Sequence, residues 1–461
     1  MLFSALTLFF IAYISLKRPV ILFIFGFFIF TFVLRTVSAG YLDVFTPVYS
    51  DNLRRIIYSE DTSIYYFLCV LLTLMPFYLI FNKNNIKMTS KRPDTYSIQA
   101  ISILSNITFA FIAIYLTLLY KDLLSSGPIP LFICMERYDY LPFAGPLHIP
   151  LFRYGAIAAM FLGALTVYPY IKRGRFDYKH LLLIITMVIY TILTGHRFSA
   201  PLTFIFYYAM PFSVLVVYKS STNVPFSLSA SMCDYKNYLL KLAPILVSAL
   251  LSISLVVMAL SNSYLFLRSH GCEHNERQIG DLELASSRLM ERIFIQPAEL
   301  LQDTIYRMKN ETTLDTDKAL HYHFSDPGLS GGDVGIRYIM LLSVGPEREN
   351  ELFEQGVQFQ GGYPEIFFVS FGEKWSWLII FISSSVIACI LIWWINSLLS
   401  GKLLSFFLIS YMYFAITALY SNGSLTFLIA TTFWIKVAAA VIVFYIESRS
   451  EYQQIVKRII G

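Results

Sequence analysis

Long apolar stretches recur along most of this chain and limit its fold more than any other feature. A transmembrane helix needs about 20 apolar residues to cross the hydrocarbon core of a bilayer. Stretches of this kind lie at residues 2–16, 19–39, 64–81, 98–120, 151–171, 181–195, 202–218, 239–261, 376–397, 403–420 and 425–446. We therefore expect an all-α polytopic membrane protein with about 11 transmembrane helices.

The composition agrees with this expectation. Charged residues make up only 14% of the 461 residues and hydrophobic residues 56%, whereas soluble domains carry roughly 25% charged residues. The 40 Phe and 32 Tyr suit lipid-facing surfaces and interfacial belts. Such a composition excludes a disordered or disulfide-scaffold protein. No basic domain stands apart from the spans, so nucleic acid is not an expected partner.

Basic residues gather in every second loop and predict the orientation in the membrane. They occur at Lys17, Arg18, Lys83, Lys87, Lys91, Arg92, Lys172, Arg173, Arg175, Lys179, Lys219, Lys236, Lys241, Lys402, Arg449, Lys457 and Arg458. The positive-inside rule then places the N-terminus outside the cytoplasm and the tail 447–461 inside it. The first stretch has no basic region before it, so we expect a retained span and not a signal peptide.

The predicted spans divide the chain into four parts. Residues 1–261 hold spans one to eight, 262–375 form one large periplasmic loop, 376–446 hold the last three spans, and 447–461 are the tail. The loop has 18 Asp and Glu against 10 Lys and Arg, and it is too long for an inert connection. Helical spacing over 281–308 predicts that it is partly helical. No phosphate-binding GxxxxGK[ST] or GxGxxG motif is present, so nucleotides are not expected substrates.

Several arginines are candidate phosphate ligands. Arg197 follows His196 in a tight turn between two spans, and a guanidinium there can grip a phosphate at two points. The alternative is an interfacial arginine that reaches lipid phosphates. Arg153 lies just inside a span, where it needs a partner or a cavity or else serves as an interface anchor.

The large loop adds three more arginines. Arg288 and Arg292 are spaced i, i+4 and share one face of the predicted helix, although Glu291 and Glu299 are alternative partners that would neutralise them. Arg337 stands in the glycine-rich segment GGDVGIRYIM. Glycines let backbone N–H groups approach an oxyanion closely, so a glycine-rich turn that binds an anion is one interpretation of this segment and an ordinary loop is the other.

Other residues suit proton transfer and sugar binding. Glu365 in GGYPEIFF and His196 are candidate general bases near the membrane surface, and Tyr363 is a candidate for stacking on sugars. An ordinary loop charge is the alternative for each acid or histidine. No His, Cys and carboxylate set has the spacing of a metal site, so no metal or other cofactor is expected. Cys134 and Cys272 lie in two predicted external segments. The sequence is equally compatible with a disulfide between them and with two free thiols.

One further charge, Lys436, stands near the middle of the last predicted span. An ammonium at that depth costs roughly 3 kcal/mol on insertion scales. We therefore expect Lys436 to face the interior of the helix bundle.

The combination of these features resembles a known family. Its elements are the many spans, an external SGPIPLF…RYDY segment, a GHR turn, and a late external loop with Arg-x3-Arg, a glycine-rich arginine segment and QGGYPE. Together they are similar to the Wzy-type O-antigen (oligosaccharide repeat-unit) polymerases. That family is often described by Arg-x10-Gly patterns in two external loops; Arg153 to Gly163 is one residue short of this pattern, and Arg337 to Gly345 is shorter still.

The resemblance implies a GT-C-like, metal-independent glycosyltransferase of the bacterial inner membrane. It would move a growing glycan from undecaprenyl pyrophosphate onto a repeat unit carried by a second undecaprenyl pyrophosphate at the periplasmic face. Membrane lipids and a chain-length regulator are the further expected partners. The roles carried over by chemistry and placement are pyrophosphate contacts for Arg197, Arg292, Arg337, Arg153 and Arg288, base or acceptor orientation for His196 and Glu365, and glycan binding for Tyr363.

Two alternatives remain. An O-antigen ligase shares the topology and the external arginine chemistry. A lipid-linked oligosaccharide flippase would instead need functional charges inside the spans, and the sequence indicates little charge there beyond Lys436.

Overall fold

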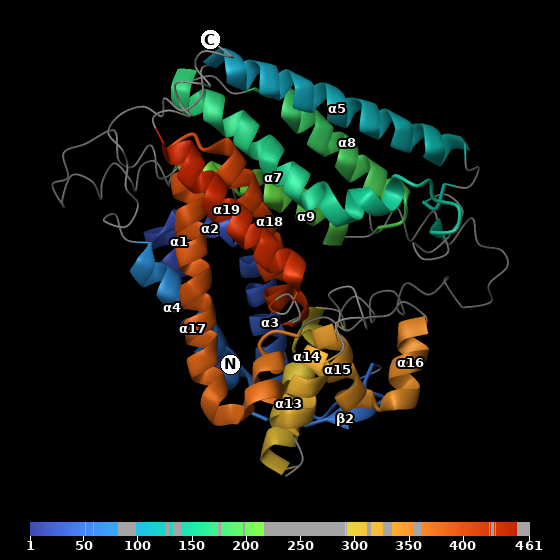
Figure 1. Cartoon of the computed structure of the whole chain (residues 1–461). Helices are drawn as coiled ribbons and strands as arrows, with labels where there is room; N and C mark the ends of the chain where they lie inside the picture. The colour runs from blue at the N-terminus through green and yellow to red at the C-terminus, as the bar shows by residue number, and fades with distance from the viewer. Residues whose placement is uncertain are drawn as a thin grey trace. The chain divides into compact units, whose positions relative to one another are not determined.

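A computed structural model describes most of the chain (Figure 1). The described residues are 1–50, 52–58, 60–81, 98–125, 129–131, 140–173, 177–196, 199–215, 291, 293–310, 315–325, 334–354, 362–423, 425, 428 and 430–449. They are helical apart from turns and one short hairpin, and the chain divides into two units. Unit 1 comprises Met1–Ala100 and Ala285–Gly461, and unit 2 comprises Ile101–Leu284.

Six helical segments of the described chain are long and apolar enough to cross a membrane. They are Phe28–Phe45, Thr62–Ile80, Ile101–Ser125, His148–Pro169, Glu365–Leu399 and Thr431–Ser448. Four shorter apolar helices lie at Leu2–Lys17, Lys179–Leu193, Pro201–Leu215 and Leu403–Tyr413. The prediction of a helical multi-pass membrane protein is confirmed. The predicted span 239–261 lies outside the described residues, so the total of about 11 remains a prediction.

Unit 1 contains most of the described spans and one polar section. Its span helices are α1 (Leu2–Lys17), α2 (Pro19–Ile24), α3 (Gly26–Phe45), α4 (Thr62–Ile80), α17 (Glu365–Leu399), α18 (Leu403–Asn422) and α19 (Thr431–Ser448). Helices α1, α3, α4 and α17 pack together, and α18 packs on both α17 and α19. The stretch predicted at 19–39 is two helices, because the backbone leaves the helical conformation at Phe25.

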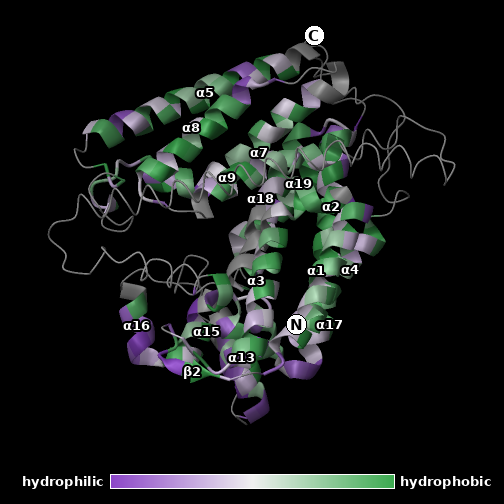
Figure 2. Cartoon of the chain, turned by 180° about the vertical axis from the view of Figure 1, so that it is seen from behind, coloured by the Kyte–Doolittle hydropathy of each residue, from purple (hydrophilic) through white to green (hydrophobic). Residues whose placement is uncertain are grey.

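The polar section packs on α3, α4 and α17 and holds helices of the predicted large loop. It comprises α13 (Gln296–Asn310), α14 (Thr316–Ser325), α15 (Val334–Val344) and α16 (Pro346–Glu354). The hairpin of β1 (Val48–Ser50) and β2 (Arg55–Ile57) packs on α13 at the same end of the unit (Figure 1). Figure 2 shows hydrophilic residues concentrated here, while the spans are mainly hydrophobic. The described part of residues 262–375 thus contains the four helices α13 to α16, and the extent and location of the predicted loop stay predictions.

Helix α17 begins earlier than the predicted span, which started at residue 376. Its first residues run from Glu365 to a kink at Gly372, where φ is 67° and ψ is 171°. A positive φ of this kind strains residues that carry a Cβ, so glycine is the residue that permits the kink. Ser376 Oγ closes the gap in the helix by donating to the Phe367 carbonyl oxygen at 2.7 Å. The kink therefore separates a short, buried first segment from the long apolar one.

Two carboxylates in unit 1 cap the start of a neighbouring helix. Asp43 near the end of α3 accepts hydrogen bonds from the Thr62 and Ser63 backbone N–H groups of α4, both at 3.0 Å. Glu447 near the end of α19 accepts from the Leu404 and Ser405 N–H groups of α18 at 3.2 and 3.0 Å. The first N–H groups of a helix have no partner within it, and a carboxylate also favours the positive end of the helix dipole. Each carboxylate thus ties two span helices together.

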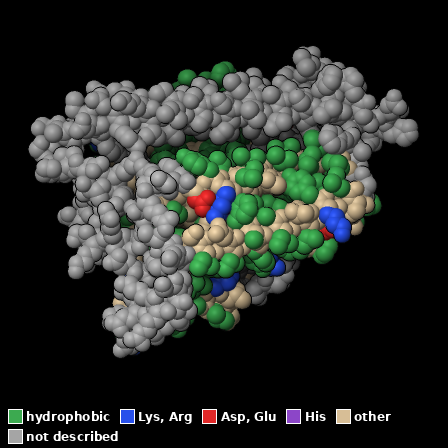
Figure 3. Space-filling model, turned by 90° about the horizontal axis from the view of Figure 1, so that it is seen from above, with side chains coloured by type: hydrophobic (Ala, Val, Ile, Leu, Met, Phe, Trp, Pro, Cys, Tyr) green, Lys and Arg blue, Asp and Glu red, His purple; other side chains and the backbone are tan. Residues whose placement is uncertain are grey.

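Unit 2 is built from α5 (Ile98–Ser125), α7 (His148–Arg173), α8 (Lys179–Leu193) and α9 (Ser199–Ala209). Hydrogen bonds tie α5 to α8 at one end, where Ser105 Oγ lies 2.9 Å from Asp177 Oδ2 and 3.0 Å from His180 Nε2. Partial burial acts to raise the pKa of Asp177, but hydrogen bonds from Lys179 and Ser105 outweigh it and leave that pKa below its usual value. The described surface seen in Figure 3 is mainly hydrophobic with few charges, as a lipid-facing surface requires.

The hydrogen bonds from the start of α4 to Asp43 can be tested by measuring stability. Asp43→Asn removes the charge and one of two acceptor oxygens, so we expect the free energy of unfolding to fall by about 1 kcal/mol. Asp61→Asn is the matched control, because Asp61 directly precedes α4 without a side-chain cap and its side chain is 69% exposed. Denaturant titration in detergent micelles measures both variants. Equal stability of the two variants would contradict the capping role.

Candidate functional site

A buried charge lies at the middle of α3. The Arg35 guanidinium forms an ion pair with the Glu365 carboxylate at the start of α17, and Arg35 is 7% exposed while Glu365 is fully buried. Arg35 Nε also donates to the Pro297 carbonyl oxygen of α13 at 2.6 Å. A charge inside a span is expensive unless it is paired and hydrogen-bonded. Helices α3, α13 and α17 therefore meet at one guanidinium.

Arg35 is not among the candidate residues predicted from the sequence. It stands within the predicted span 19–39, and the rule that singled out Lys436 applies to it equally. The expectation of little span charge beyond Lys436 is therefore wrong. Its partner Glu365 was identified, but nothing in the spacing links two residues that lie 330 positions apart.

Polar and aromatic side chains from α4, α17 and α18 surround this ion pair. The Arg35 guanidinium carbon lies 5.8 Å from the centre of the Tyr66 ring, within cation–π range. Thr73 and Tyr363 share a hydrogen bond between their hydroxyl groups, and the Tyr363 ring centre lies 4.7 Å from that of Tyr420. We call this group the Arg35 cluster; its members are Arg35, Tyr66, Cys69, Thr73, Tyr363, Glu365 and Tyr420, all of them buried.

Two polar atoms of the cluster have no hydrogen-bond partner among the described residues. They are the second carboxylate oxygen of Glu365, Oε2, and the hydroxyl of Tyr66. Buried polar groups in proteins are nearly always hydrogen-bonded. The cluster thus offers one acceptor and one hydroxyl, on α17 and α4, for a further polar group.

A second contact fixes the start of α13 to α3. Ser38 lies one turn beyond Arg35, on the same face of the helix. Its hydroxyl lies 3.0 Å from the Phe294 carbonyl oxygen and 3.1 Å from that of Ile295, and it accepts from the Ala298 N–H at 3.1 Å. Because Arg292 comes just before this stretch in the sequence, α3 holds the segment that directly follows one of the predicted phosphate ligands.

The acidic face of α13 binds the β hairpin. Glu299 is fully buried and accepts from Ser50 Oγ at 2.6 Å and Asn52 Nδ2 at 2.5 Å. Asp303 pairs with Arg55 of the hairpin, and also with Arg307 of α13 at 3.1 Å. The structure shows Glu299 holding the hairpin, and the loop arginines that the sequence offered as its partners, Arg288 and Arg292, lie outside the described residues.

The structure places two predicted site residues, Tyr363 and Glu365, in the Arg35 cluster. A general base must reach the proton that it removes. Glu365 is fully buried and its carboxylate is paired with Arg35. This arrangement suits an anchor that positions α3, α13 and α17 better than a base that contacts substrate.

Two other predicted residues, His196 and Arg153, lie in unit 2. The His196 ring stacks on Phe152 with the ring centres 4.1 Å apart and an angle of 15° between them. Phe152 directly precedes Arg153 near the start of α7, so both candidates belong to one corner of the unit. Arg153 is exposed, and its guanidinium carbon lies 5.8 Å from the Tyr154 ring centre. That exposure fits the interface-anchor alternative as well as phosphate binding.

The environment of Arg337 differs from the expectation. Val334–Val344 is helix α15, so the prediction of a glycine-rich turn at Arg337 is wrong. Arg337 Nε donates to Glu349 Oε1 of α16 at 2.5 Å, and its Nη2 donates to Asn350 Oδ1 at 3.2 Å. The periodicity of VGIRYIMLLSV predicts a helix once the preceding glycines are set aside. A carboxylate already matches the charge of Arg337.

The structure describes only some of the remaining candidate residues. Arg197, Arg288, Arg292, Cys134 and Cys272 lie outside the described residues. Lys436 is half-buried with its ammonium nitrogen 5.0 Å from the Tyr411 ring centre of α18, and its position in the interior of the bundle stays a prediction. Across the described ranges, no three His, Cys, Asp or Glu side chains gather closely enough to hold a metal ion.

The Arg35–Glu365 pair has a characteristic mutational signature. Arg35→Met or Glu365→Leu alone leaves one buried charge without its partner, and we expect each to lower the free energy of unfolding by about 3 to 5 kcal/mol. The double variant should cost less than either single one, because no buried charge remains. Lys436→Met, at a half-buried site, is the control with a smaller expected loss. Additive losses in a double-mutant cycle would contradict the pairing.

Comparison with known proteins adds one match. Residues 329–436 match a family of unknown function, DUF6418. The matched stretch contains Arg337, Tyr363 and Glu365 but not Arg35. No curated protein and no solved structure matches the chain. The chain is thus similar over that stretch to a family to which no activity is assigned.

Proposed function

We propose that the protein is a metal-independent polymerase of a surface polysaccharide in the bacterial inner membrane. It transfers a growing glycan from undecaprenyl pyrophosphate to a repeat unit on a second undecaprenyl pyrophosphate. The anomeric C–O bond to the pyrophosphate breaks, a glycosidic bond to an acceptor hydroxyl forms, and the hydroxyl proton passes to a base. The resemblance of the sequence to the O-antigen polymerases motivates this proposal.

The observation that carries the proposal is the attachment of the polar section to the spans through Arg35 and Ser38. Both side chains bind backbone atoms of residues 294–298, directly after Arg292. A pyrophosphate leaving group needs fixed cations where its charge develops, and preorganised electrostatics of this kind is worth several kcal/mol. A rigid junction between span and loop is what such a site requires.

The roles within this reaction are those that the resemblance implies, adjusted where the structure describes the residue. Arg197, Arg288 and Arg292, which lie outside the described residues, are assigned to the pyrophosphates; Arg153 is a further candidate phosphate ligand and His196 the candidate base. Glu365 acts as a positioning residue through Arg35, and Tyr363 supports the same cluster. Arg337 would have to exchange Glu349 for a phosphate, so its contribution is secondary.

A transporter of lipid-linked oligosaccharide is the second candidate function. The buried Arg35–Glu365 pair favours it specifically, because ionisable residues inside spans often mark substrate or proton pathways. The folded polar section favours the enzyme. Purified protein in liposomes separates the two: a polymerase lengthens lipid-linked repeats without ATP or an ion gradient, and a transporter does not.

The test in cells uses a strain that lacks the native gene. Arg197→Ala and Arg292→Ala should each lower polymerisation by about 100-fold or more, as loss of one preorganised donor does, and leave lipopolysaccharide with a single repeat unit on a gel. Arg348→Ala is the matched control, since Arg348 pairs with the half-exposed Glu351 at 2.5 Å on α16. Bare core in the deletion strain would identify a ligase instead. Full-length ladders with both variants at normal abundance would refute the proposal.

A further inference from the structure

Three contacts hold His196 in the turn that follows α8. Its backbone N–H donates to the Thr191 carbonyl oxygen at 3.0 Å, its ring stacks on Phe152, and its Nδ1 lies 3.3 Å from Thr194 Oγ1. A neutral imidazole carries its proton on one of the two ring nitrogens, and the partner of the other nitrogen decides which. The state of His196 therefore depends on where the Thr194 hydroxyl sends its own proton.

The Thr194 hydroxyl has two carbonyl acceptors. Thr194 is fully buried, and its Oγ1 lies 3.0 Å from the Tyr190 carbonyl oxygen and 3.2 Å from that of Thr191. A hydroxyl has a single proton. If that proton pointed at His196 Nδ1, the Oγ1 lone pairs would face both carbonyl oxygens, and the oxygens would repel one another. The proton is therefore shared with the carbonyls, and the His196 Nδ1–H donates to Oγ1.

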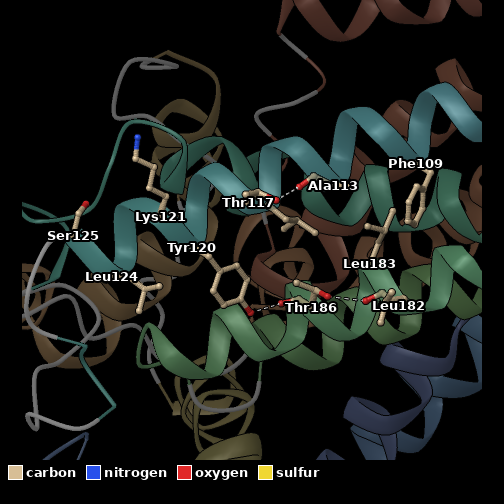
Figure 4. Close-up of a pocket in the computed structure, with 11 residues that line it drawn as sticks. Phe109, Ala113, Thr117, Tyr120, Lys121, Leu124, Ser125, Leu182, Leu183 and Thr186 are labelled. Atoms are coloured by element: carbon tan, nitrogen blue, oxygen red, sulfur yellow. Dashed lines mark hydrogen bonds between the residues drawn. The ribbon is translucent and has the colours of Figure 1, made fainter.

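Neighbouring helices fix the end of α8 that supplies these carbonyls. Tyr120 of α5 donates to the Thr186 carbonyl oxygen at 2.9 Å, as Figure 4 shows, one turn before Tyr190. The Tyr120 ring centre lies 5.5 Å from that of Tyr190. The Tyr190 hydroxyl in turn lies 3.0 Å from Nδ1 of His148 at the start of α7. Contacts to α5 and α7 thus hold the backbone that accepts the Thr194 proton.

The position of the proton decides which atom of His196 can act as a base. With the proton on Nδ1, the in-plane lone pair is on Nε2, the nitrogen at the far end of the ring. Histidine in water favours the opposite arrangement, with its proton on Nε2. A hydroxyl that accepts from Nδ1 can therefore impose the less common tautomer.

We propose that Thr194 is a positioning residue that holds neutral His196 in the Nδ1–H tautomer, so that Nε2 accepts the proton of the acceptor sugar hydroxyl. This role rests on the proposed function, in which His196 is the candidate base. The acceptor oxygen bonds to the anomeric carbon as its proton passes to Nε2, and the C–O bond to the pyrophosphate breaks with its electron pair on the pyrophosphate oxygen. The imidazolium so formed keeps its Nδ1–H bond to Thr194, because both ring nitrogens are then donors.

Nitrogen-15 NMR of the purified full-length protein tests the tautomer without any substrate. The seven histidines are labelled, and the signals absent from His196→Gln belong to His196. At alkaline pH, where imidazoles are neutral, we expect the N–H signal at Nδ1 and the lone-pair signal at Nε2. Thr194→Val removes the hydroxyl and should move the proton to Nε2, whereas Thr194→Ser should keep it on Nδ1. A wild type with the proton on Nε2, or a Thr194→Val variant that keeps it on Nδ1, would overturn the proposal.

The matched control is Thr191→Val. Thr191 is also buried near the end of α8, but its hydroxyl donates to the Val188 carbonyl oxygen at 2.7 Å. Its bond to His196 uses the backbone oxygen, which the substitution keeps. Thr191→Val should therefore leave the tautomer as in the wild type. Loss of the Nδ1–H tautomer in this control would mean that packing of the helix end, and not the Thr194 hydroxyl, sets the tautomer.

Polymerisation of lipid-linked repeats in liposomes connects the tautomer to the reaction. Thr194→Val should lower the rate by about 100-fold, the lower end of what a positioned base contributes, while Thr194→Ser and Thr191→Val should stay near the wild-type rate. A Thr194→Val variant with the proton moved to Nε2 and an unchanged rate would overturn the role of Nε2 as the base. A wild type that joins no repeats would instead refute the polymerase function, and with it the role of Nε2 in transfer, whichever tautomer NMR shows.

Discussion

Unit 1 depends on the need to compensate a guanidinium inside an apolar span. Hydrocarbon offers no counter-ion and no water, so Arg35 has to find its partners within the protein. It takes a carboxylate from α17 and a backbone carbonyl from α13. Because these two partners come from a span and from the polar section, one electrostatic requirement specifies how both are placed against α3.

The other polar contacts of unit 1 also give polar groups their partners within the protein, and each requires less free energy than burying the Arg35 charge. Asp43 and Glu447 satisfy the first N–H groups of neighbouring helices, and Ser38 satisfies backbone groups at the start of α13. Glu299 and Asp303 on α13 then hold the β hairpin that follows α3. Hydrogen bonds and ion pairs thus supply the specific contacts that apolar surfaces, which pack equally well on lipid, do not provide.

The sequence predicts some parts of this arrangement well and others poorly. Apolar length alone predicts the span helices, because the bilayer demands it. The ends are predicted less well: the span was expected to begin at residue 376, but α17 begins at Glu365, because the charged residues Glu373 and Lys374 after the Gly372 kink separate a first apolar segment from the long one. Glu365 and Tyr363 were identified, but their meeting with Arg35 was not, because one sequence contains no record of which distant residues touch. Arg337 was misjudged because nearby glycines outweighed a short helical pattern.

The separation between Arg35 and Glu365 has a consequence for how the chain is made. The two residues are 330 positions apart, and ribosomes add roughly 5 to 20 residues per second. The arginine is therefore synthesised about 15 to 70 seconds before its counter-ion exists. Throughout that interval α3 carries an uncompensated charge, which favours a holding state in the insertion machinery or at a hydrated boundary. The packing of α3 that the structure shows is thus complete only after the last third of the chain has been made.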